Sequence, residues 1–124
     1  MRNLNYVLLA VRNPRESATV YTQLLGCTPV VNSETFVLYV LPTGLKVGLW
    51  LESEAEPKPK APGGVELSFT EESREAVLQT HDAWKQLGLE VLQAPTDMPF
   101  GFTCVFEDLD GHRLRPFAPA SNPR

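Results

Sequence analysis

Residues Pro99–Phe117 read P-F-G-F-T-C-V-F-E-D-L-D-G-H-R-L-R-P-F, and this stretch predicts a β-hairpin. Two runs rich in aromatic and β-branched residues, Phe102–Glu107 and His112–Phe117, flank the four-residue turn Asp108–Gly111. The glycine at the end of this turn takes a positive φ angle at little cost, which is typical of hairpin turns. We therefore expect the chain to end in two antiparallel strands.

The two faces of this hairpin differ in chemistry. If Glu107 lies opposite His112, Val105 and Leu114 share an aliphatic face. The other face then carries aromatic, thiol and guanidinium side chains, namely those of Phe102, Cys104, Phe106, Arg113, Arg115 and Phe117. Aromatic rings beside arginines are unusual in a core and suit the wall of a binding site.

Composition limits the class of protein. The chain has 124 residues, of which 43% are hydrophobic and 21% charged, as expected for a single soluble globular domain of residues 1–124. Its net charge of -4 argues against nucleic acid or an anionic membrane as partner. Cys27 and Cys104 lack C-x-x-C spacing and follow no secretory signal, so we expect reduced cysteines in a cytoplasmic protein, with a disulfide as the alternative.

The first half of the chain predicts one helix among strands. Leu4–Val11 is an apolar run typical of a strand covered on both sides. Asn13 and Pro14 provide a helix N-cap and first position, and Gly26 a C-cap, so a helix is expected over Pro14–Leu25. Three further strands are expected at Val30–Asn32, Phe36–Leu41 and Lys46–Leu51.

The second half repeats this order after an irregular linker over residues 53–62. Val65, Leu67 and Phe69 alternate with polar residues as in a strand, and Thr70 or Ser73 can cap a helix that ends at Gly88. A short strand over Leu89–Gln93 and a loop over Ala94–Gly101 then lead into the hairpin. Residues 1–52 and 63–124 are thus two modules of strand, helix and three strands.

The repeat is also visible in the residues. A shift of 67 positions places Thr43–Trp50 on Asp110–Phe117, so that Lys46 matches Arg113 and Gly48 matches Arg115. The pattern predicts an α+β domain with an internal duplication.

The chain resembles the vicinal oxygen chelate superfamily, also called the glyoxalase/bleomycin-resistance/dioxygenase family. The resemblance lies in V-R-N-P entering the first helix, L-L-G at its end, the tandem βαβββ order and D-L-D-G-H before the last strand. It implies two βαβββ modules whose mixed sheet forms a half-open cup. It also implies a homodimer, with exchange of modules between chains as an alternative.

The same resemblance identifies four positions where metal-dependent members carry His, Glu or Gln. These positions fall on Tyr6, Gly48, Gly64 and Arg115. Glycine has no donor side chain, and arginine brings a positive charge that repels a cation. We therefore expect neither a metal nor another cofactor.

Without metal ligands, the cup is expected to present aromatic residues and an arginine. The candidate ligand-binding residues are Tyr6, Tyr39, Gly48, Trp50, Gly64, Glu66, Phe102, Arg115 and Phe117. Phe106 belongs to the same wall, and Val37 is the alternative to Tyr39, depending on hairpin register. The two glycines leave room for a flat guest close to the backbone, and Arg115 pairs with a carboxylate of the guest, stacks on it, or pairs with Glu66.

The pattern is most similar to the metal-free, antibiotic-binding branch, including phenazine-antibiotic resistance, through G-L-W, P-T-D and D-G-H-x-x-R. It indicates a protein that sequesters a planar aromatic small molecule, with no nucleic acid or membrane partner. The alternative is a glyoxalase-like lyase, isomerase or dioxygenase with a non-standard site, in which Glu66 is a general base of raised pKa. A ligand sensor or accessory partner is a third hypothesis.

We interpret Trp84, His81, His112 and the Asp108 and Asp110 pair as structural, and Trp50 as a pocket or dimer-interface residue.

Overall fold

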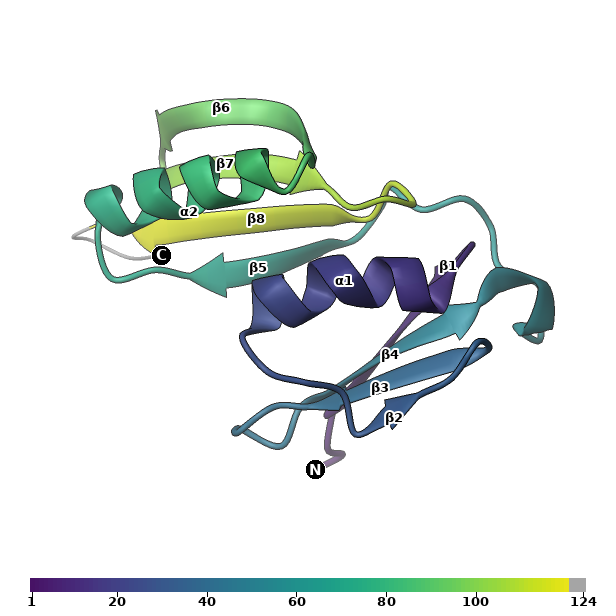
Figure 1. The fold of residues 1–124 in the computed structure, drawn as a ribbon. Coiled ribbons are helices and arrows are strands. Elements are labelled where there is room, and N and C mark those ends of the chain that lie inside the picture. Colours follow the sequence, from purple (N-terminus) through teal and green to yellow (C-terminus); the bar gives the residue numbers. More distant parts are fainter. Residues whose placement is uncertain (121–124) are drawn as a thin grey trace. The chain divides into compact units, whose positions relative to one another are not determined.

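The computed structural model describes residues 1–120 and has α+β architecture with two helices and two four-stranded sheets (Figure 1). The chain divides into two compact units, Met1–Lys60 and Ala61–Arg124. Each unit has the βαβββ order expected from the sequence. In the described part of the chain, no helix has the length and apolar character needed to cross a membrane.

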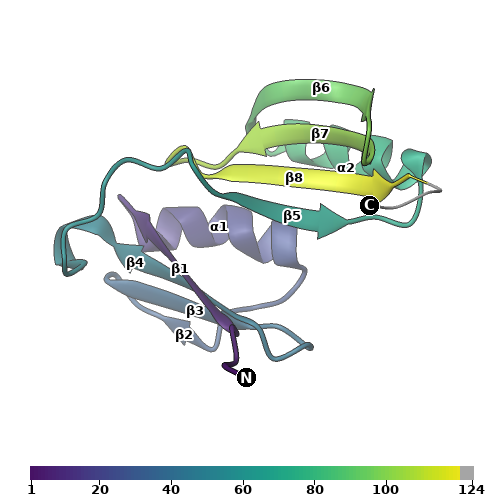
Figure 2. The same cartoon turned by 180° about the vertical axis from the view of Figure 1, so that it is seen from behind.

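The first unit contains one helix against one mixed sheet. Its elements are β1 (Tyr6–Val11), α1 (Pro14–Leu25), β2 (Val31–Asn32), β3 (Phe36–Val40), β4 (Lys46–Leu51) and the short 3-10 helix η1 (Glu52–Glu54). The sheet order is β1-β4-β3-β2, with β1 parallel to β4 and the other pairs antiparallel. Figures 1 and 2 show α1 along one side of this sheet, which leaves the opposite side as an open face. Because η1 covers Glu52–Glu54, the irregular linker expected over residues 53–62 begins with a short 3-10 helix.

Helix α1 begins and ends at the predicted residues, because its caps are local. The Asn13 side chain accepts a hydrogen bond from the Glu16 amide at 3.1 Å, and Pro14 occupies the first turn. Gly26 has a φ angle of 69° and donates its N–H to the Thr22 carbonyl oxygen.

Tyr39 lies between this sheet and α1. Its side chain is fully buried, and its hydroxyl donates to the Ala18 carbonyl oxygen at 3.1 Å and lies 2.9 Å from the Thr22 hydroxyl. The expectation that Tyr39 lies beside Trp50 on the wall is wrong, because alternation along β3 points Tyr39 and Val37 toward the helix. Phe36 and Leu38 take the open face instead.

The second unit has the same topology. Its elements are β5 (Glu66–Thr70), α2 (Arg74–Gln86), β6 (Glu90–Met98), β7 (Gly101–Glu107) and β8 (Arg113–Pro119), in the sheet order β5-β8-β7-β6. Ser73, one of the two expected caps, accepts a hydrogen bond from the Ala76 amide. The loop expected over Ala94–Gly101 is wrong, since β6 continues to Met98 through two irregularities in its pairing with β7.

The final hairpin forms, but its register differs from the prediction by one residue. Glu107 pairs with Arg113, not with His112. The Asp108 amide donates to the His112 carbonyl oxygen, while the Asp108 carboxylate accepts from the amides of Asp110 and His112 at 2.9 and 2.8 Å. These bonds hold a loop one residue longer than the expected turn.

This shift exchanges the two faces of β7. Phe106 packs on the helix side, with its ring centroid 5.6 Å from that of Trp84, and Phe102 lies under Arg74, whose guanidinium carbon is 4.0 Å from the ring centroid. Cys104 lies on the same side by alternation, while Thr103 and Val105 take the side of Arg115. The prediction that Phe102, Cys104 and Phe106 line the wall is therefore wrong, as is the pairing of Val105 with Leu114.

Candidate functional site

The open face of the first unit is apolar except for Lys46. Three rows of register partners cross it: Tyr6, Lys46 and Val40; Leu8, Gly48 and Leu38; and Ala10, Trp50 and Phe36. Leu8 is 52% exposed and Tyr6 is 41% exposed. The structure thus places the predicted residues Tyr6, Gly48 and Trp50 together on one face.

Gly48 does not provide the vacant slot expected from the sequence. A Cβ atom there would lie 2.8 Å from Leu8 Cδ2 and 3.0 Å from two ring atoms of Phe36. Leu8 and Phe36 therefore converge over the glycine, which permits their close approach. Gly64 precedes β5, is exposed, and has no atom within 4 Å of a built Cβ, so it is not part of the face of either sheet.

The open face of the second unit is organised around Arg115. Its Nε and Nη2 donate to the two carboxylate oxygens of Glu66 at 2.7 and 3.1 Å. Its Nη1 donates to Gln93 Oε1 at 3.2 Å and to Thr103 Oγ1 at 3.3 Å. The pairing of Arg115 with Glu66 is confirmed, and four of the five guanidinium N–H groups have partners.

A second arginine shares the same carboxylate. Arg113 Nη2 lies 2.8 Å from Glu66 Oε2. Hydrogen bonds from Arg115 are the main cause that lowers the pKa of Glu66, and the charges of both arginines act in the same direction. The expected raised pKa of Glu66 as a general base is therefore wrong, because two guanidinium groups stabilise the ionised form.

Two aromatic rings border this charged group. Phe117 is on the Arg115 side of β8, and its ring centroid is 6.1 Å from that of Phe100. The guanidinium carbon of Arg115 is 5.6 Å from the Phe100 centroid. Sequence reasoning treated Phe100 as a loop residue. In the sequence, only the position of Phe100 between two strand-forming runs indicated that it could lie beside Arg115.

The observed strand register assigns a different residue to one of the four metal-ligand positions. Tyr6 pairs with Lys46 in the first unit and Glu66 pairs with Arg113 in the second. Because Lys46 and Arg113 are repeat equivalents, Glu66 corresponds to Tyr6, and Gly64 does not. The four positions are then held by Tyr6, Gly48, Glu66 and Arg115. They offer a phenol, no side chain, a carboxylate that is paired with two guanidinium groups, and a guanidinium. This set does not fit a divalent cation, and no cluster of three His, Cys, Asp or Glu suited to a metal occurs among residues 1–120.

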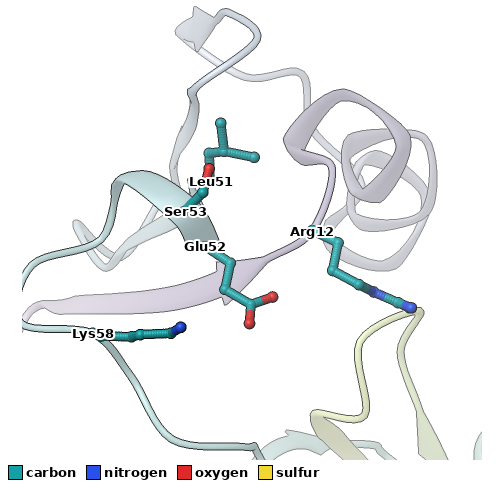
Figure 3. Close-up of a pocket in the computed structure, with 5 residues that line it drawn as sticks. All are labelled: Arg12, Leu51, Glu52, Ser53 and Lys58. Carbon is teal, nitrogen blue, oxygen red and sulfur yellow. The ribbon is translucent and has the colours of Figure 1, made fainter.

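Two surface hollows among the described residues are lined mainly by residues that the sequence did not predict for the site. One of about 260 Å³ in the first unit is lined by Arg12, Leu51, Glu52, Ser53 and Lys58. Figure 3 shows the Glu52 carboxylate pointing into the space between the Lys58 and Arg12 side chains. Another of about 420 Å³ lies beside the start of α2, and Phe102 is the one predicted site residue among those that line it.

Comparison with known proteins identifies the class. The model of the Glyoxalase/Bleomycin resistance protein/Dioxygenase superfamily matches residues 3–115, and the chain belongs to this superfamily. The resemblance stated from the sequence is thereby confirmed at the level of the superfamily. A search of curated proteins gave no match.

Solved structures support the same fold. The chain is similar to protein ATC0852 from Agrobacterium tumefaciens, with 43% identity and a TM-score of 0.90 over 98% of this chain and 100% of that one. A glyoxalase-related enzyme from Fulvimarina pelagi has 18% identity and a TM-score of 0.84, covering 95% and 88% of the two chains. Lactoylglutathione lyase from A. tumefaciens has 14% identity and a TM-score of 0.73, covering 94% and 92%. The last two share the fold alone.

Proposed function

We propose that this chain is a metal-free binding protein that sequesters a planar aromatic small molecule, such as an aromatic antibiotic, and so confers resistance. The observation that carries this proposal is the apolar open face of the first unit, where Trp50 lies between Phe36 and Ala10 in the sheet register. The donor set at the metal-ligand positions of the superfamily supports binding rather than metal-dependent catalysis.

The face suits a flat apolar guest on physical grounds. An aromatic ring stacked on Trp50 or Phe36 gains about 0.5–1.5 kcal/mol per ring pair beyond the burial of area. Leu8 and Tyr6 are about half exposed, so a guest would also remove their apolar surface from water. A cytoplasmic protein in excess over a tightly bound drug keeps the free drug concentration low by mass action.

The resemblance to the phenazine-resistance branch supports phenazine-type compounds as the first probes. The segments that carry it are Gly48–Trp50, Pro95–Asp97 and the D-G-H-x-x-R run that ends at Arg115. We propose this branch as the nearest functional class within the superfamily.

Tryptophan fluorescence tests the proposal. The chain has two tryptophans, and Trp84 is buried against Phe69 and Phe106. In a Trp84→Phe variant, Trp50 alone reports, and titration with phenazine and related flat heterocycles should quench it. Because the probe itself absorbs light and can imitate quenching, calorimetry of the same mixtures verifies that binding occurs. A Trp50→Phe variant is the matched control, and its remaining emission should not change. Absence of heat and quenching with every probe would rule out a stacking site at Trp50.

The enzyme alternative predicts a different result. A glyoxalase-like lyase, isomerase or dioxygenase would convert hemithioacetals or catechols, with or without an added divalent metal. The lowered pKa of Glu66 makes this carboxylate a weaker base than that alternative assumed. Turnover of these substrates by the wild type would favour the enzyme over the binding protein, and loss of that turnover in a Glu66→Gln variant that is still folded would assign the base to Glu66.

We also propose that the protein is a homodimer, with exchange of modules between chains as the alternative arrangement. The exposed apolar side chains Leu4, Val31 and Val65 support association. Sedimentation velocity at several concentrations tests this, and a single monomeric species would contradict it.

A further inference from the structure

We infer that Arg113 forms an anion-binding subsite on the open face of the second unit, and that this subsite takes a planar aromatic carboxylate whose ring stacks on Arg115. This inference goes beyond the stacking surface proposed around Trp50 in the first unit and is tested independently of it. It transfers to Arg113 the carboxylate-pairing role that the sequence suggested for Arg115.

Arg115 is already committed within the protein. Four of its N–H groups donate to Glu66, Gln93 and Thr103, and its side chain is only 15% exposed. A guest that took Arg115 would have to break a bidentate pair, the strongest arrangement for this side chain. Arg115 is therefore a fixed planar surface that holds Glu66 in place.

Arg113 has hydrogen-bond donors that are not paired within the described part of the protein. Its Nη2 pairs with Glu66, which Arg115 already shares, and its Nε is buried without a hydrogen-bond partner. The side chain as a whole is 37% exposed. A buried donor without a partner is costly, so Arg113 is held by fewer interactions than Arg115 and is the guanidinium left to pair with an incoming acceptor. Two guanidiniums to one carboxylate also leave this cluster with a surplus positive charge.

The surroundings of Arg113 favour an aromatic acid over a simple anion. Arg113 and Arg115 are two residues apart on one side of β8, hence about 7 Å apart along the strand. A ring stacked on the fixed guanidinium of Arg115 would carry a ring carboxylate to Arg113, because guanidinium planes stack on aromatic faces. Glu107 lies opposite Arg113 in the register but forms no ion pair among the described residues, so it acts as a competing charge.

Calorimetric titration with 2-naphthoate and 2-naphthamide tests this inference, since the two probes share a ring system and differ in charge. The wild type should bind the carboxylate about tenfold more tightly than the amide, the value of one charge-assisted contact. Arg113→Gln should bring the ratio close to one while the amide affinity is kept. Glu107→Gln should increase the ratio, because it removes the competing carboxylate.

Two controls separate the subsite from general charge. Lys85→Gln, in the last turn of α2, makes the same charge change elsewhere in the unit and should leave the ratio unchanged. Arg113→Lys keeps the charge but loses the fork and should give an intermediate ratio. Circular dichroism and the urea midpoint verify that each variant is folded. Equal affinities for both probes in the wild type, or no binding of either probe, would overturn the anion subsite, and the Trp50 fluorescence titration separately decides the proposed binding function.

Discussion

Replacing Glu66 by glutamine should destabilise the second unit. The carboxylate accepts hydrogen bonds from Arg115 at 2.7 and 3.1 Å and lies 2.8 Å from an Arg113 nitrogen. Hydrogen bonds to charged groups contribute about 1.5–3 kcal/mol each, and glutamine keeps one acceptor oxygen. Since the Glu66 side chain is 27% exposed, partial hydration reduces the loss. We expect Glu66→Gln to lower the free energy of unfolding by about 2 kcal/mol near pH 7.

The effect should depend on pH in a defined direction. The pKa of Glu66 in the folded protein is lowered from its ordinary value of 4.5, chiefly by the hydrogen bonds from Arg115. Its stabilisation is therefore complete above pH 4.5 and is lost as the pH falls through the lower folded-state pKa. The variant has no such carboxylate. The difference in unfolding free energy between wild type and variant should be constant from pH 8 to 6 and close below about pH 4.5.

Urea unfolding followed by Trp84 fluorescence, in a Trp50→Phe background, measures this difference in the second unit. A double-mutant cycle with Arg115→Gln should give a coupling energy of about 1–3 kcal/mol. Glu107→Gln is the matched control, since that carboxylate lies on the same face without an ion pair, and should change stability by less than about 0.5 kcal/mol. A difference for Glu66→Gln that persists unchanged at pH 3, or a coupling energy near zero, would refute the reasoning.

Three further outcomes follow from the packing. Tyr39→Phe should lower the unfolding free energy by about 1 kcal/mol in urea titrations, because one buried and one part-buried hydrogen bond are lost; an unchanged midpoint would contradict it. Gly48→Ala should destabilise by about 1 kcal/mol in the same assay through crowding of the side chains above it, whereas Gly64→Ala, which meets open space, should not; equal effects would show that the crowding is relieved. Burial raises the pKa of Cys104 to about 11, so at pH 8 a thiol reagent should modify Cys27 at least about tenfold faster; equal rates in Cys27→Ser and Cys104→Ser variants would argue against a buried thiol.

The sequence predicted best those features that are stabilised by neighbouring residues. The limits of α1 follow from Asn13, Pro14 and Gly26, all within a turn of the helix end they define. Register in the last hairpin was not predictable in this way. Gly101 to Phe106 are all buried, so alternation between buried and exposed positions does not distinguish the two faces of β7. The side-chain bonds of Asp108 decide the register, and they depend on a loop length that composition does not specify.

The sequence predicted which side chains lie on the open face only in strands where polar residues alternate with apolar ones. Glu66, Arg115 and Phe117 lie on the open face of the second unit as expected, because alternation in β5 and β8 is clear. Phe36–Val40 contains only apolar residues, so nothing in the sequence distinguished the side of Tyr39 from that of Phe36. Apolar residues on both faces of β3 therefore account for the error at Tyr39, whereas burial on both faces of β7 accounts for that at Phe102.

The internal repeat also explains why one metal-ligand position was misassigned. The last strands of the two units match with a shift of 67 residues, Lys46 to Arg113, but the first strands match with a shift of 60, Tyr6 to Glu66. The second unit has a nine-residue β6 where the first has a two-residue β2, so no single shift aligns both ends. With the correct shift, the position holds a carboxylate, the residue type a metal site needs. The inference against a metal therefore depends on Arg113 and Arg115, which hold that carboxylate ionised and occupied.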